Sequence, residues 1–130
     1  MKFKLLIALC LVLNIACAQK KTTSNSVKSD NLEITVTEDD NSFEYKSRFN
    51  PDLTDKVRNY LSKTLAKGSS TGFSNTEVDA EMKLDNGAFF YISLHPGKLR
   101  IKLDKRKNSA EIYKRFKADC DGLKQIMENK

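Results

Sequence analysis

The most informative segment for the fold is residues 78–104, which read VDAEMKLDNGAFFYISLHPGKLRIKLD. Apolar and polar side chains alternate along most of it, and a period of two is typical of a strand with one buried face. Asn86-Gly87 and Pro96-Gly97 are strong turn signals, so they divide the segment into three strands. We therefore predict an antiparallel meander, in which a tight Asn86-Gly87 turn pairs Leu84 with Phe89.

The length of the second loop determines which apolar side chains share a face, because a one-residue slip turns every side chain of a strand over. A two-residue Pro96-Gly97 loop would align the apolar residues of the last strand with Phe90, Ile92 and Leu94. A three-residue loop over 95–97 would align them with Phe89 and Tyr91 instead. We favour the three-residue loop, since it builds one continuous apolar face from all three strands.

The favoured register turns Phe90, Ile92 and Leu94 to the opposite face of the sheet. Three large apolar side chains in a row need cover, because a wide exposed apolar patch usually marks an interface. One helix on each face would cover them. Two helices on the other face would leave them open as a partner or dimer surface with a charged rim. These three residues are therefore candidate binding residues.

Residues before the meander predict a hairpin and a helix. Alternation over 32–37 and 43–49 indicates two strands that flank the acidic turn Glu38-Asp39-Asp40-Asn41. Asn50 is a good N-cap for a helix that begins at Pro51 and ends at Gly68. A Ser/Gly-rich loop then leads into the meander.

A second helix follows the meander. It begins at Asn108 or Ser109, and Gly122 lies within it as a helix-weakening residue. A chain of 130 residues with 39% hydrophobic residues suits one folded domain and is too apolar for disorder. We predict a single α+β domain over residues 31–130, with an antiparallel sheet of about five strands, two helices and the order β-β-α-β-β-β-α.

Residues 1–18 have the pattern of an export signal peptide. A basic start, Met1 to Lys4, precedes an apolar run from Leu5 to Leu13 and a stretch of small residues. The run is too short to span a bilayer, and no apolar run of 18 residues occurs elsewhere. Residues 19–30 contain a single apolar side chain, so we predict a flexible polar linker.

The signal peptide has two alternative cleavage sites. Cleavage after Ala18, at the A-x-A pattern of residues 16–18, would release a soluble protein that begins at Gln19. The segment Leu13-Asn14-Ile15-Ala16-Cys17 resembles the lipobox of bacterial lipoproteins. That resemblance implies cleavage before Cys17 and attachment of a diacylglycerol to its sulfur. The polar stretch that follows suits a tether, so we favour the lipoprotein, located in the periplasm or outer cell envelope.

The cysteine count supports both cleavages. Cys10 leaves with the signal peptide, and Cys17 is either lipidated or removed, so Cys120 remains without an intramolecular disulfide partner. Cys120 lies on the apolar stripe of the last helix. We predict that it is a buried structural thiol rather than a catalytic nucleophile.

We find no catalytic, metal or cofactor motif. His95, the single histidine, precedes Pro96 in a turn, and no second imidazole accompanies it. Asp79 and Glu81 share one strand face, but a solvated face explains them better than paired catalytic carboxylates. The acidic turn at 38–41 lacks the spacing of an EF-hand loop. We therefore expect no enzyme activity, no metal and no cofactor.

Basic residues gather after the meander's second turn. Between Lys98 and Lys117 there are nine cationic and two acidic residues, a local net charge of +7. Such a patch attracts anionic partners. The candidate binding cations are Lys98, Arg100, Lys102, Lys105, Arg106 and Lys107.

These observations favour a small exported binding or interaction protein, inhibitor-like in character, with an unidentified protein or an anionic envelope component as its partner. An exported protein is separated from chromosomal DNA, so we expect no nucleic-acid partner. We expect membrane contact through the lipid anchor alone. A small exported hydrolase and a purely structural envelope component are the alternatives. The oligomeric state stays open.

Overall fold

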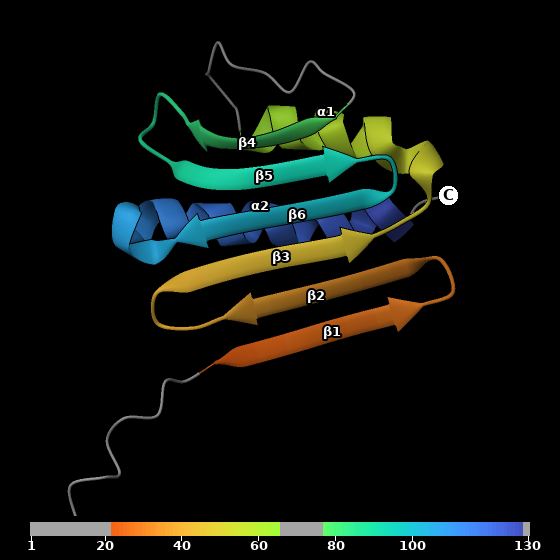
Figure 1. Ribbon diagram of the computed structural model, residues 1–130, viewed down its shortest axis with the longest axis horizontal. Helices are drawn as coiled ribbons and strands as arrows, with labels where there is room; N and C mark the ends of the chain where they lie inside the picture. Colours follow the sequence, from red (N-terminus) through yellow and green to blue (C-terminus); the bar gives the residue numbers. More distant parts are fainter. Residues whose placement is uncertain (1–21, 66–76, 129–130) are drawn as a thin grey trace, which may run out of the picture.

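The computed structural model describes residues 22–65 and 77–128. Within these ranges it contains a six-stranded antiparallel sheet and two α-helices (Figure 1). The elements are β1 (Thr23–Ser29), β2 (Leu32–Glu38), β3 (Ser42–Arg48), a 3₁₀ turn (Pro51–Leu53), α1 (Thr54–Thr64), β4 (Val78–Lys83), β5 (Phe89–His95), β6 (Lys98–Asp104), a second 3₁₀ turn (Lys105–Lys107) and α2 (Ala110–Glu128). The α+β class and the antiparallel sheet are confirmed.

The sheet consists of two three-stranded meanders joined at their last strands. Its spatial order is β1-β2-β3-β6-β5-β4, so β3 and β6 are the central pair. This pairing aligns Tyr45 with Ile101 and Lys46 with Arg100. The first meander has three strands rather than the predicted two, which accounts for the sixth strand.

The additional strand, β1, corrects the prediction of a flexible linker over residues 23–29. It pairs with β2 along its whole length, from Thr23 opposite Glu38 to Ser29 opposite Leu32. All seven of its residues are exposed. Backbone hydrogen bonds to β2 therefore hold this strand without burial of its side chains, and polarity alone does not mark such an edge strand as a linker.

The predicted register of the second meander is wrong at both turns. The Asn86-Gly87 signal belongs to a three-residue loop, in which Gly87 has φ +92° and the Leu84 N–H donates to the Ala88 carbonyl at 2.8 Å. The Pro96-Gly97 loop has two residues, because His95 pairs with Lys98. Pro followed by a glycine with φ +74° is the type II turn pattern.

Both loop lengths therefore place Phe90, Ile92 and Leu94 on the same face as the apolar residues of β6. Ile92 lies opposite Ile101, and Leu94 lies opposite Leu99. The alternate residues of β5 include Ser93 and His95, whose polar groups would have been buried in the predicted register. Polar side chains are costly to bury, so this arrangement satisfies the strand better.

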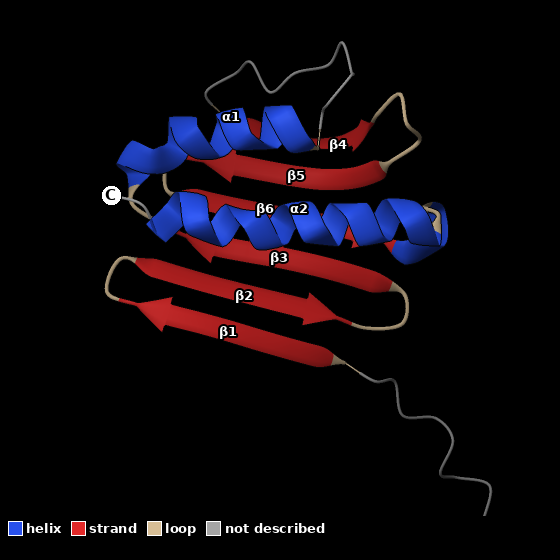
Figure 2. Cartoon of the chain, turned by 180° about the vertical axis from the view of Figure 1, so that it is seen from behind, coloured by secondary structure: helices blue, strands red, loops and turns tan. Residues whose placement is uncertain are grey.

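Both helices pack on this apolar face, and α2 lies over the central strands (Figure 2). Phe116 of α2 contacts Phe43 of β3 and Phe90 of β5, with ring centroids 6.3 and 5.1 Å apart. The core is formed by buried side chains of the sheet and both helices: Leu32, Ile34, Phe43, Tyr45, Phe49, Leu53, Val57, Leu61, Leu65, Leu84, Ala88, Phe90, Ile92, Leu94, Leu99, Ile101, Leu103, Phe116, Cys120, Leu123 and Met127. The stripe proposed as a binding surface is therefore core.

Cys120 is fully buried between α2 and the sheet, as predicted. Burial raises the pKa of its thiol, and the nearby carboxylates of Asp119 and Asp121 raise it further. The thiol therefore stays protonated, and a protonated buried thiol is a poor nucleophile. This environment does not favour a catalytic role for Cys120.

The turn between β5 and β6 is fastened to the start of α1. The Phe49 N–H donates to the Gly97 carbonyl, and the Gly97 N–H donates to the Thr54 hydroxyl, both at 3.0 Å. The Thr54 hydroxyl in turn donates to the Pro51 carbonyl at 2.6 Å. Asn50 caps this junction, as predicted, by accepting a hydrogen bond from the Asp52 N–H. The expected helix end at Gly68 lies outside the described residues.

The start of α2 is fastened to β5 in a similar way. Ser109 caps the helix by accepting from the Ile112 N–H at 3.2 Å. Asn108 instead bonds both the N–H and the carbonyl of Phe89, at 2.8 and 2.9 Å. The helix continues through Gly122, where the hydroxyl of Tyr60 lies so close that a β-carbon would meet it at 2.0 Å.

Candidate binding surface

The face of the sheet away from the helices, called here the open face, carries cations on its two central strands. Alternation along β3 and β6 sends their apolar residues to the helices and their charged residues to the open face. Five basic side chains result: Lys46 and Arg48 on β3, and Lys98, Arg100 and Lys102 on β6. We call these five residues the basic stripe.

Like charges face each other across the centre of the stripe. Arg48 lies directly opposite Lys98, and Lys46 lies directly opposite Arg100. Cross-strand pairs of like charge destabilise a sheet, so this arrangement costs stability. Among the described residues, neither Arg48 nor Lys98 has a salt bridge. Glu33 is the cross-strand neighbour of Arg48 on β2 but forms no salt bridge with it, so the repulsion between Arg48 and Lys98 is at most partly offset.

Glu44 neutralises part of the other end of the stripe. Its carboxylate lies 3.3 Å from Lys46, 3.0 Å from Arg100 and 3.6 Å from Lys102. Partial burial would raise the pKa of Glu44, but the hydrogen bonds from Arg100 and Lys46 outweigh it and hold the pKa below its ordinary value. Glu44 therefore stays ionised at neutral pH, as one carboxylate among several cations.

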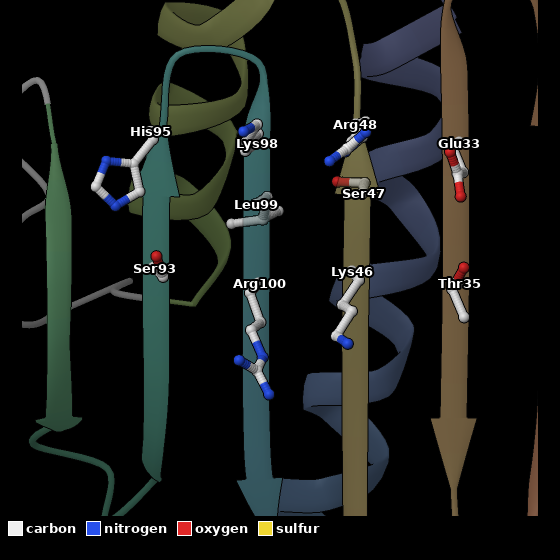
Figure 3. Close-up of a pocket in the computed structure, with 10 residues that line it drawn as sticks. All are labelled: Glu33, Thr35, Lys46, Ser47, Arg48, Ser93, His95, Lys98, Leu99 and Arg100. Atoms are coloured by element: carbon white, nitrogen blue, oxygen red, sulfur yellow. The ribbon is translucent and has the colours of Figure 1, made fainter.

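A hollow of about 300 Å³ lies on the open face around the Arg48–Lys98 and Lys46–Arg100 pairs. Figure 3 shows its lining side chains in two rows across the strands. The first row runs through His95, Lys98, Arg48 and Glu33, and the second runs through Ser93, Arg100, Lys46 and Thr35. Cations of β3 and β6 thus flank the centre of the hollow, and hydroxyl groups and His95 stand at its ends.

His95 has a different position from the turn that we predicted for it. It is the last residue of β5, and its side chain lines the hollow. Its Nδ1 atom lies 3.6 Å from the Glu77 carboxylate. The structure therefore adds His95, which the sequence analysis treated as a turn residue, to the candidate surface as a hydrogen-bonding group.

A second hollow of about 670 Å³ continues along the same face toward the end of β6. Arg100 lines both hollows, so the two adjoin. The second is lined by the cations Lys102, Arg106 and Lys107, the carboxylates of Asp39, Glu81 and Asp104, and the aromatic rings of Phe89 and Tyr91. Arg106 lies 3.1 Å from Asp104. The Lys107 ammonium lies 5.1 Å from the centre of the Phe89 ring.

Acidic side chains stand on both sides of the basic stripe. Glu33 of β2 lies beside Arg48, while Asp79 and Glu81 of β4 lie beyond β5. Asp79 accepts a hydrogen bond of 2.6 Å from the Tyr91 hydroxyl. Asp79 and Glu81 are both exposed, on the solvated strand face that we predicted.

Five of the six predicted binding cations lie on the open face, in two groups. Lys98, Arg100 and Lys102 belong to the stripe, and Arg106 and Lys107 line the second hollow. Lys105 points elsewhere: its ammonium lies 2.8 Å from Glu38 and 4.6 Å from the centre of the Tyr113 ring. Lys117 of α2 also contacts Glu38, at 3.1 Å. Lys105 therefore ties β2 to the rest of the domain and is unavailable to a partner.

Sequence reasoning missed Lys46 and Arg48. Both alternate with buried Tyr45 and Ser47, so their exposure was predictable. Their place beside β6 depends on a pairing between residues fifty or more positions apart, and no local pattern indicates such a pairing. Cys17, the predicted lipidation site, lies outside the described residues.

Other kinds of site find no support in residues 22–65 and 77–128. No cluster of three or more His, Cys, Asp or Glu side chains in these ranges could hold a metal ion. Neither described helix has the length and hydropathy to cross a membrane. Comparison with known protein families, with curated proteins and with solved structures finds no match to this chain.

Proposed function

We propose that this protein is an exported, envelope-associated binding protein that takes up an anionic partner on its open sheet face. The observation that supports this most strongly is the like-charged Arg48–Lys98 pair at one end of the basic stripe, where neither side chain forms a salt bridge with another described residue. A protein keeps a repulsive pair at a stability cost where the site gains from it. An anion between the two side chains would relieve the repulsion, and Arg48 offers the planar fork that carboxylates and phosphates fit.

Charge reversal at position 98 tests this function. We expect Lys98→Glu to weaken binding of anionic probes by at least about tenfold, because it removes one cation of the stripe and puts an anion in its place. The same change places a carboxylate opposite Arg48, so the melting temperature should stay unchanged or rise. Suitable probes are oligogalacturonate, polyglutamate and phosphatidylglycerol vesicles, measured by calorimetry or co-sedimentation at low salt.

A matched control is Lys56→Glu, which makes the same charge change on an exposed residue of α1, on the other side of the sheet. It should leave probe binding nearly unchanged. Equal effects of the two variants would show that net charge alone attracts the probes, which would contradict a site on the open face.

Attachment of the protein to the envelope is the second part of this proposal. The Ala16-Cys17 pair and the hydrophobic run before it support lipidation of Cys17. In a bacterial host that expresses the full sequence, metabolic labelling with an alkyne analogue of palmitate should label the protein. Cys17→Ser should abolish the label. Cys120→Ser should keep the label. A soluble product that begins at Gln19 would refute lipidation.

A further inference from the structure

The two hollows on the open face form one trough along β6. They adjoin at Arg100, and cations line the trough from Lys98 to Lys107. Carboxylates also line it: Glu33 in the first hollow, and Asp39, Glu81 and Asp104 in the second. The seven residues of β6 extend over about 23 Å, so the trough is long relative to a single small anion. On the premise that the open face binds an anionic partner, we infer that this partner is one linear acidic glycan chain lying along β6.

The charges beside the trough favour a narrow chain over a flat anionic surface. Glu33 borders the trough on the β2 side, and Asp79 and Glu81 border it on the β4 side. A lipid bilayer would cover the whole face and bring its headgroups against these carboxylates, where like charges repel. A single chain over β3 and β6 would contact the basic stripe, with Glu33 and Glu81 at its sides and Asp39 and Asp104 only at the far end of the second hollow. The charge pattern therefore selects a linear polyanion.

The aromatic residues of the trough favour a glycan over an acidic peptide. Phe89 and Tyr91 are half-buried on the open face, and both line the second hollow. The hydrogen bond from Tyr91 to Asp79 holds the tyrosine side chain in place. Sugar rings have apolar C–H faces that pack on aromatic rings, whereas the side chains of an acidic peptide have no such surface.

Arg48 offers a second element of recognition, whereas the Nε and Nη2 atoms of Arg100 already donate to Glu44, at 3.3 and 3.0 Å. A guanidinium binds a carboxylate through two parallel hydrogen bonds, which suits the repeated acid groups of a uronic-acid or sulfated chain. Ser93 and Thr35 add hydroxyl groups at the ends of the first hollow, where they can bond the hydroxyls of a sugar. The combination of cations, hydroxyls and aromatic rings corresponds to the groups of an acidic glycan.

Binding of three probes to the full chain tests this inference: oligogalacturonates of increasing length, polyglutamate of matched charge, and phosphatidylglycerol vesicles. We expect oligogalacturonate affinity to rise with length until the trough is filled, and vesicles to bind weakly. Tyr91→Leu keeps an apolar side chain but removes the ring, so it should lower oligogalacturonate affinity about fivefold. The same variant should leave polyglutamate affinity unchanged.

The possible outcomes separate this inference from the proposed function. If vesicles bind more tightly than oligogalacturonate and Lys98→Glu abolishes that binding, the open face is a membrane-binding surface and the glycan inference is overturned. Polyglutamate that binds as tightly as oligogalacturonate, with no effect of Tyr91→Leu on either, would also overturn it. If Lys98→Glu changes the binding of none of the three probes, the proposed function fails as well. Phe89→Leu serves as a second variant if Tyr91→Leu lowers the melting temperature.

Discussion

Replacing Gly97 by alanine will destabilise the domain by about 2–4 kcal/mol. Gly97 has φ +74°, a region that residues with a β-carbon rarely adopt. A β-carbon here would also lie 2.8 Å from the Phe49 carbonyl oxygen and 3.1 Å from the Pro51 ring. The backbone of Gly97 is held by hydrogen bonds on both its N–H and its carbonyl, so the turn cannot move away without breaking them. Urea denaturation at neutral pH measures the loss.

Gly87→Ala is the matched control for that variant. Gly87 also has a positive φ, of +92°, but a β-carbon there would meet its nearest neighbour among the described residues, the Ile112 side chain, at an ordinary 3.7 Å. We expect a loss of about 1–2 kcal/mol from the backbone conformation alone. The difference between the two variants measures the close contact of the β5–β6 turn with the β3–α1 junction. Equal losses would mean that this contact contributes nothing.

Introducing a charge at Ile92 should unfold the protein. Ile92 is fully buried between the sheet and the helices, opposite Ile101. Ile92→Asp places a carboxylate where its neighbours are apolar, and an unpaired buried charge costs several kcal/mol, a large part of the stability of a small domain. Circular dichroism and a thermal melt should show a collapsed melting temperature or no cooperative transition.

Ser93→Asp is the control for that prediction. It adds the same charge one residue further along β5, on the open face, opposite Arg100. A surface change of this kind usually alters stability by about 0.5 kcal/mol or less. We therefore expect a folded variant with weakened binding of anionic probes. If the loop at 95–97 had three residues, Ser93 would be buried and Ile92 exposed, and the effects of the two variants on stability would be exchanged. This pair of variants therefore tests the strand register directly.

Local patterns predicted the elements of the second meander but not their alignment. Asn86-Gly87 and Pro96-Gly97 do mark its turns, and the three strands lie where alternation indicated. Each loop length was misjudged by one residue, and each error turned the neighbouring strand over. The informative detail was the identity of the polar residues on β5. Ser93 and His95 alternate with Ile92 and Leu94, and their polarity assigns them to the solvent side.

The candidate surface was half predictable for a related reason. Its β6 cations follow from the run of basic residues after Lys98, which is visible along the chain. Its β3 cations follow from alternation, but their position beside β6 is a property of the long-range pairing. Lys105 illustrates the reverse case, since its sequence neighbours suggest a shared binding role while Glu38 and Tyr113 engage it in the domain. Charge along a chain predicts a patch only where topology brings the charges to one face.

Strand β1 limits how far the domain can stand from whatever holds Cys17. The sheet begins at Thr23, so Ala18 to Thr22 are the residues that separate it from that cysteine. Even a fully extended chain of this length covers at most about 20 Å. With a lipid on Cys17, the Thr23 end of β1 therefore stays within that distance of the headgroup layer. The protein would then bind ligands immediately above the bilayer surface. A ligand anchored further away would have to extend to the membrane to be bound.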